Sequence, residues 1–160
     1  VYAYRFDWDE QPSILGMDFS FLLGAGHGLE IPFVMGDFDF GRQTRFLFTK
    51  KNEHERNKLS KVIMQYWTNF AKEGYPSNES ENITPWNKWP KGGINQNRIM
   101  ILDTEQSNAP RMSNGYVPHN KLVSIFESDE RSLKVDNKCY FLEDVYSWVD
   151  SWKSKNNACQ

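Results

Sequence analysis

The feature that most constrains the fold is a long segment, residues 52–72, whose apolar residues recur at helical spacing. An i, i+3, i+4, i+7 pattern gathers side chains on one face of an α-helix. The residues in this pattern are Leu59, Val62, Ile63, Tyr66, Trp67, Phe70 and Ala71. Gly74 follows, and glycine commonly ends a helix in the left-handed conformation. The opposite face, which we interpret as solvated, carries Glu53, Glu55, Arg56, Lys58 and Lys61.

Two segments on either side of this helix predict β-strands. Residues 1–8 read VYAYRFDW, a run of aromatic and β-forming residues typical of a strand interior. Because the chain opens directly on such a strand, we expect it to begin in the middle of a fold. The second strand is expected at residues 98–103.

The remaining segments are less regular. We expect a mixed apolar loop at residues 14–26 and an irregular surface loop at residues 75–97, where Trp86 and Trp89 provide apolar anchors. Residues 103–137 are polar and give no clear assignment. Within them, residues 121–126 fit either a strand or the beginning of a helix. A last helix is predicted at residues 140–153, where the apolar face contains Phe141, Leu142, Val145, Trp148, Val149 and Trp152.

Length and charge restrict the function classes. The 160 residues suit one domain or one piece of a larger one, and a net charge of −2 without like-charge blocks argues against nucleic-acid binding. No window of 18 apolar residues is present, so no membrane span is predicted. The 24 aromatic residues (6 Trp, 7 Tyr and 11 Phe) are many for this length.

His27 is the candidate catalytic residue. A lone histidine is more often structural or exposed, but His27 stands between Gly26 and Gly28, just before a short helix that Pro32 would begin and Gly36 would end. A glycine-flanked loop gives a general base access without bulky neighbours. The other two histidines, one on the long helix and one after a proline, are interpreted as surface residues.

Several segments, in the same order, resemble the type-B carboxylesterase and cholinesterase family of α/β-hydrolases. Residues 26–36, GHGLEIPFVMG, resemble the family's catalytic-histidine segment, and residues 1–8 resemble the strand ahead of it. Residues 65–76 resemble the long helix and its Gly-x-Pro turn, residues 86–90 the Trp-Pro loop, and residues 139–141 the start of the closing helix.

The resemblance implies an α/β fold in which residues 1–160 form the C-terminal segment of a single α/β-hydrolase domain. The family order is Ser, acid, His, and no Gly-x-Ser-x-Gly motif occurs in this sequence. The expected function is therefore a serine carboxylesterase segment in which His27 serves as the base for a serine on a missing N-terminal portion. That portion would be its partner, the chain alone would be inactive, and no cofactor is expected. Tyr2, Tyr4, Phe6, Trp148 and Trp152 would pack against the missing portion.

The neighbours of His27 refine this expectation. Glu30 could substitute for the triad acid, but in the family this position is a structural carboxylate and the acid lies far upstream, so we reject it. Cholinesterases carry an aromatic residue two positions after the histidine, where it lines a cationic site; here Leu29 occupies that position. The resemblance therefore implies a small-molecule ester with an uncharged, apolar group.

The compartment is expected to be extracytoplasmic, by secretion or in a periplasm. The sequons at Asn78 and Asn82 predict a glycoprotein. Cys139 resembles a family cysteine that pairs upstream of the histidine, which would leave Cys159 unpaired. A Cys139–Cys159 bridge and a pair of free thiols remain alternatives.

Two other functions compete with the esterase. One is a catalytically inactive, cholinesterase-like adhesion or binding module. The other is a freestanding α+β domain. An accessible base between two glycines argues against the first, and the ordered agreement of several segments argues against the second.

Overall fold

The computed structural model describes residues 1–42, 44–78, 81–91, 96–115 and 119–128. The chain divides into two compact units, Val1–Gly115 and Tyr116–Gln160. In the second unit the described element is the helix α4, His119–Ser128, which decides between the two alternatives predicted for residues 121–126. The predicted helix at residues 140–153 and both cysteines lie outside the described residues.

A three-stranded mixed sheet organises the first unit. Strand β1 (Ala3–Phe6) pairs in parallel with β4 (Ile99–Leu102), with Ala3 opposite Ile99 and Phe6 opposite Leu102. Strand β5 (Arg111–Ser113) pairs antiparallel with β4 on its other side. Both predicted strands are confirmed with shorter bounds, whereas β5 and the 3₁₀ helix η1 (Glu105–Ser107) lie in the segment left without an assignment.

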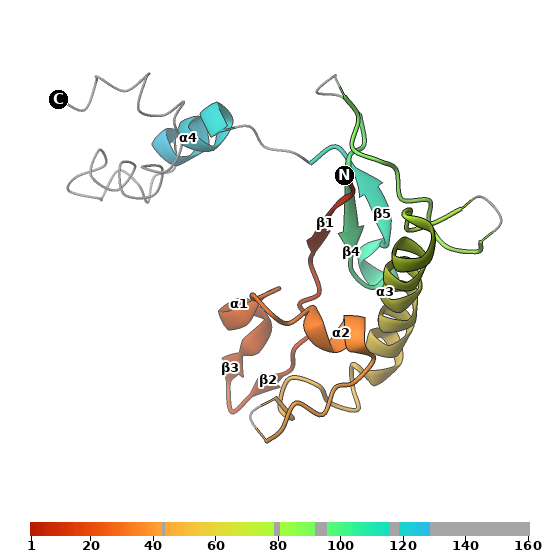
Figure 1. Ribbon diagram of the computed structural model, residues 1–160. Coiled ribbons are helices and arrows are strands. Elements are labelled where there is room, and N and C mark those ends of the chain that lie inside the picture. Colours follow the sequence, from red (N-terminus) through yellow and green to blue (C-terminus); the bar gives the residue numbers. More distant parts are fainter. Residues whose placement is uncertain (43, 79–80, 92–95, 116–118, 129–160) are drawn as a thin grey trace. The chain divides into compact units, whose positions relative to one another are not determined.

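The long helix α3 (Glu53–Glu73) confirms the strongest prediction, and Gly74 ends it at φ +78°. Beside α3 lies the short helix α2 (Ile31–Met35), which ends at Gly36 as expected (Figure 1). The core lies between the sheet and these two helices. Its buried residues are Trp8, Phe33, Leu59, Ile63, Tyr66, Trp86, Met100 and Leu102.

Three small elements stand where a loop was predicted, at residues 14–26. They are the hairpin strands β2 (Ser13–Ile14) and β3 (Met17–Asp18), and the helix α1 (Phe19–Leu23). The turn residues Leu15 and Gly16 have φ values of +52° and +81°. A two-residue hairpin turn with positive φ favours Asn or Gly, so leucine in the first position hides the turn from sequence analysis.

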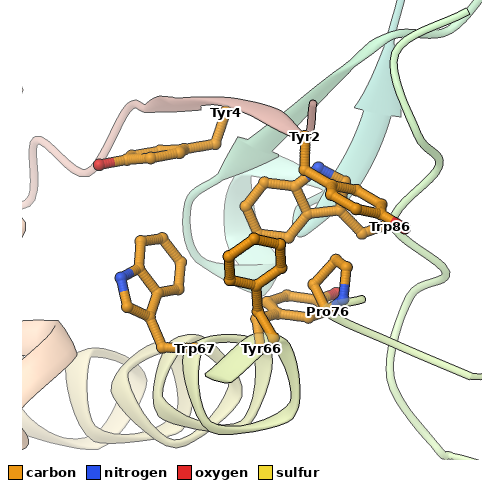
Figure 2. A pocket seen from close by; sticks show the side chains of 7 residues that line it. Tyr2, Tyr4, Tyr66, Trp67, Pro76 and Trp86 are labelled. Atoms are coloured by element: carbon orange, nitrogen blue, oxygen red, sulfur yellow. The ribbon is translucent and has the colours of Figure 1, made fainter. Parts of the chain in front are cut away.

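The aromatic side chains of β1 and the neighbouring Tyr2 pack on other aromatic rings of this chain. The ring centroids of Tyr4 and Trp67 are 5.2 Å apart, and those of Phe6 and Phe33 are 5.1 Å apart. Tyr2 lies edge-on to Trp86 at 6.4 Å. Tyr2, Tyr4, Trp67 and Trp86 are among the residues that line an apolar cavity of about 210 Å³ between β1 and α3 (Figure 2). Much of the aromatic excess therefore packs on this chain's own helix.

At both ends of helix α3, the buried and exposed residues differ from those predicted. Arg56, expected in solvent, is only 6% exposed, and its guanidinium lies 4.4 Å from the ring centroid of Phe38. Its Nη1 donates to the Thr49 carbonyl at 3.1 Å. Phe70, expected in the core, is 52% exposed, and Ala71 is exposed as well. The core covers the middle of the helix, while the chain that precedes it folds back over Arg56.

Candidate functional site

The chain leaves β1 and reaches His27 through the hairpin and α1. Asp18 caps α1, because its Oδ1 accepts hydrogen bonds from Ser20 N at 3.0 Å and Phe21 N at 3.3 Å. These bonds satisfy backbone donors that have no partner within the helix. They also lower the pKa of the Asp18 carboxyl, with the Ser20 hydroxyl as the largest cause. The helix that precedes the His27 loop is thus capped at its N-terminus.

Three glycines shape this loop. Gly24 ends α1 at φ +50° and ψ −143°, and Gly28 has φ +85°; side chains disfavour both conformations. At Gly26 a Cβ atom would lie 3.2 Å from the Leu23 carbonyl oxygen. The glycines let the backbone turn closely on either side of His27, as the sequence pattern predicted.

His27 lies in the turn between Gly26 and α2, and its side chain is exposed. Among the residues that the structure describes, none forms a hydrogen bond or an ion pair with the imidazole. This applies to Glu30 too, although it is only three residues away. Instead, burial and the Glu30 carboxylate raise the pKa of the Tyr4 phenol, so Glu30 acts electrostatically on β1.

Leu29, the expected substrate-binding residue, is half-buried in the same turn. Its backbone N donates to the Gly26 carbonyl at 3.2 Å, and its Cδ1 lies 3.6 Å from where a Cβ on Gly26 would stand. The side chain therefore leans on the loop that carries His27. The two candidate residues belong to one compact turn.

Helix α2 fixes the far end of this turn. Phe33 is fully buried, and its carbonyl accepts a 2.9 Å hydrogen bond from the buried Ser60 hydroxyl on α3. At Gly36, a Cβ atom would lie 2.6 Å from Met64 Sδ, so the two helices approach closely where α2 ends. The core thereby positions the chain that immediately follows His27.

A pair of carboxyl groups, Asp103 buried and Glu10 half-buried, lies beyond the ends of the two parallel strands, and sequence analysis missed it. Thr104 links the two groups: its N donates to Asp103 Oδ1 at 2.7 Å, and its Oγ1 donates to Glu10 Oε1 at 2.5 Å. Burial is the largest cause that raises the pKa of both carboxyls, and the Asp103 charge raises that of Glu10 further. Asp103 directly follows β4, and a polar residue at a strand end was the available signal.

The described residues contain no cluster of His, Cys, Asp and Glu side chains that could hold a metal ion. Over the same residues, no helix has the length and apolar character needed to cross a membrane.

Comparison with known proteins identifies the chain's relatives. A family model described as "Carboxylesterase family" matches residues 1–120, three quarters of the chain. The chain belongs to the carboxylesterase family.

Individual relatives agree with this membership. Acetylcholinesterase of Danio rerio is 33% identical over 66% of this chain and 15% of its own length. Para-nitrobenzyl esterase of Bacillus subtilis (strain 168) is 34% identical over 66% of this chain and 18% of its own length. Human cocaine esterase is 36% identical over 48% of this chain and 13% of its own length. The carboxylesterase chain thus spans less than a fifth of the length of these relatives.

Membership confirms the family resemblance of the sequence and, with it, an ester-hydrolase family of the α/β-hydrolase class. The mixed sheet with helices packed against it agrees with that class. The accidental resemblance that the α+β alternative assumed is therefore wrong.

Proposed function

We propose that this chain is the C-terminal segment of a carboxylic-ester hydrolase, and that His27 is the general base of its catalytic triad. The observation that carries the proposal is the exposed imidazole between Gly26 and Gly28, in a turn whose ends are held by α1 and α2. The serine and the acid belong to an N-terminal portion that precedes these residues. His27 takes the proton from the serine hydroxyl and returns it to the leaving alcohol, while the acid orients its other ring nitrogen.

The location of the turn supports this role. It follows β1, which is parallel to β4, and in open α/β sheets ligands bind in the crevice beyond the carboxyl ends of parallel strands. A general base at this position needs one free ring nitrogen. The His27 imidazole is exposed, and none of the described residues forms a hydrogen bond with it.

The test uses the full-length polypeptide that contains this chain. His27→Gln should lower hydrolysis of a short-chain aryl ester by about 10³-fold or more, since removing a triad member leaves only a small residual rate. The matched control is His54→Gln, because the His54 side chain is 79% exposed on α3. It should leave the rate unchanged. Full activity of His27→Gln would overturn the proposal.

The substrate is proposed to carry an uncharged, apolar group, because Leu29 stands two positions after the proposed base. An aromatic face there would attract a quaternary ammonium by about 0.5 to 2 kcal/mol, and leucine lacks that attraction. Short-chain aryl or alkyl esters should therefore be hydrolysed in preference to choline esters. Leu29→Tyr should reduce the preference for aryl or alkyl esters over choline esters. A preference of the unmodified enzyme for choline esters would contradict this assignment.

The second candidate is a catalytically inactive, cholinesterase-like adhesion or binding module that keeps the fold for protein contacts. An organophosphate probe separates the two, because only an activated serine reacts with it. The full-length protein should be labelled on one serine. A fully folded protein that takes up no label would favour the module. The sequons at Asn78 and Asn82 support secretion in either case.

A further inference from the structure

We infer that Gln11 is a positioning residue for the proposed base. Its Nε2 donates a 2.8 Å hydrogen bond to the carbonyl of Gly24, three residues before His27. This inference rests on the proposed function, since it assigns Gln11 the task of holding the loop on which His27 acts.

The geometry of the amide allows one orientation only. The Gly24 carbonyl can accept but not donate, so the NH₂ group of Gln11 must face it. Gln11 is 5% exposed, so leaving its amide donor without the Gly24 carbonyl would be costly in the folded protein. Burial of the donor therefore favours this hydrogen bond.

The loop itself supplies little stiffness. Glycine is the least restricted residue, and three of the five residues from Gly24 to Gly28 are glycine. Across the part of the chain that the structure describes, Gln11 is the one side chain that hydrogen bonds to the backbone of this stretch. Three residues extend at most about 11 Å, so fixing Gly24 restricts where His27 can lie.

Gln11 can act as a tether because its own backbone is anchored. The preceding residue, Glu10, is held on two sides. Its carbonyl accepts from Asn52 Nδ2 at 2.9 Å, and its Oε1 accepts from Thr104 Oγ1 at 2.5 Å. Asn52 precedes α3 and Thr104 follows β4. The Gln11 side chain thus connects the loop before His27 to residues that are fixed by α3 and β4.

The test replaces Gln11 in the full-length polypeptide. Gln11→Met keeps the length and apolar volume but removes the donor. Gln11→Asn keeps the amide but is one methylene too short to reach Gly24, and it serves if the methionine variant does not fold. Both should lower kcat and kcat/KM for an aryl ester by the same factor, at least fivefold, because a base displaced by about 1 Å costs up to about 10²-fold.

The rate is measured per active site, with sites counted by complete reaction with an organophosphate. A purely structural role would reduce the number of sites and the thermal midpoint, but not kcat per site. The matched control is Tyr66→Phe, which also removes a hydrogen bond from a buried side chain to a backbone carbonyl, 2.7 Å from Tyr66 Oη to Thr84 O. It should keep kcat per site within twofold.

The outcomes separate the two proposals. If His27→Gln is inactive and the Gln11 variants keep kcat per site within twofold of the unmodified enzyme, the positioning role is wrong and the proposed function stands. If the Tyr66→Phe control loses as much kcat per site as the Gln11 variants, the effect is not specific to the loop and the inference is wrong. Full activity of His27→Gln overturns both.

Discussion

The hydroxyl of Ser60 donates a 2.9 Å hydrogen bond to the backbone carbonyl of Phe33, which joins α3 to the short helix that follows His27. Ser60 is 2% exposed and Phe33 is fully buried. A five-residue helix is too short to be stable by itself. The conformation of the turn that carries His27 and Leu29 therefore depends on contacts with the core.

Ser60→Ala tests this dependence. The substitution leaves a buried carbonyl without its donor and should lower the free energy of unfolding by about 1 to 2 kcal/mol. Denaturant unfolding measures the change. Ser124→Ala is the control, since Ser124 is exposed on α4 and its hydroxyl donates to the Lys121 carbonyl of the same helix. No loss in the Ser60 variant beyond that of the control would argue against the contact.

Gly36→Ala should destabilise the protein more than Gly74→Ala. Both glycines end a helix with positive φ, so each alanine pays about 1 to 2 kcal/mol for a left-handed conformation. At Gly36 the new Cβ also meets Met64 Sδ at 2.6 Å, whereas at Gly74 it meets nothing within 4 Å. Equal losses in the two variants would contradict this prediction and show that the flexible end of the Met64 side chain moves aside without cost.

A double-mutant cycle measures the contact between residue 36 and Met64. Adding Met64→Ala to Gly36→Ala should cost less than the sum of the single changes, because shortening Met64 makes room for the new methyl group. Additive free energies, from the same denaturant measurement, would contradict the close contact.

Glu10→Gln should raise stability at neutral pH. The pKa of Glu10 is raised in the folded protein, mainly by burial. A raised carboxyl pKa contributes stability that is complete below the ordinary value of about 4.5 and is lost as pH rises through the folded value. The unmodified protein should therefore lose stability as pH rises above about 4.5, and the glutamine variant should lose less. Its amide oxygen can still accept from Thr104.

Unfolding midpoints between pH 4 and pH 8 provide the comparison. Glu105→Gln is the matched control, because the Glu105 side chain is 70% exposed, and it should keep the pH dependence of the unmodified protein. A Glu10→Gln profile parallel to that of the unmodified protein would refute the assignment.

Arg56→Lys should cost about 2 kcal/mol even though the charge is kept. Lysine lacks the planar fork that donates to Thr49 and stacks 4.4 Å from Phe38. Lys61→Met, on the exposed face of α3, should change the free energy of unfolding by less than about 0.5 kcal/mol. The prediction fails if the two variants unfold at the same denaturant concentration.

The elements that sequence analysis predicted well are those with a strong local pattern. The apolar spacing from Leu59 to Phe70 required a helix, and Gly74 marked its end. The apolar runs of β1 and β4 required strands. Strand β5 carried no such signal, because its three residues, Arg111–Ser113, become a strand only by pairing with β4.

The candidate site likewise contains features that sequence analysis predicted and features that it missed. The Gly-His-Gly pattern identified His27 and its turn from sequence, and the structure describes that turn with the imidazole exposed. Gln11 and Gly24, or Glu10 and Thr104, lie 13 and 94 residues apart along the chain. Pairs at such separations leave no trace in local periodicity.

By itself the sequence determined the family, the long helix, the existence of the strands β1 and β4 and the glycine-flanked histidine, because each depends on neighbouring residues. Only the tertiary structure decided that Arg56 is buried, that Tyr4 of β1 packs on Trp67 of α3, and that Gln11 reaches the loop of His27. Those features arise when the folded chain brings distant groups together and removes the water between them. Their free energy depends on burial and geometry, which local sequence patterns do not encode.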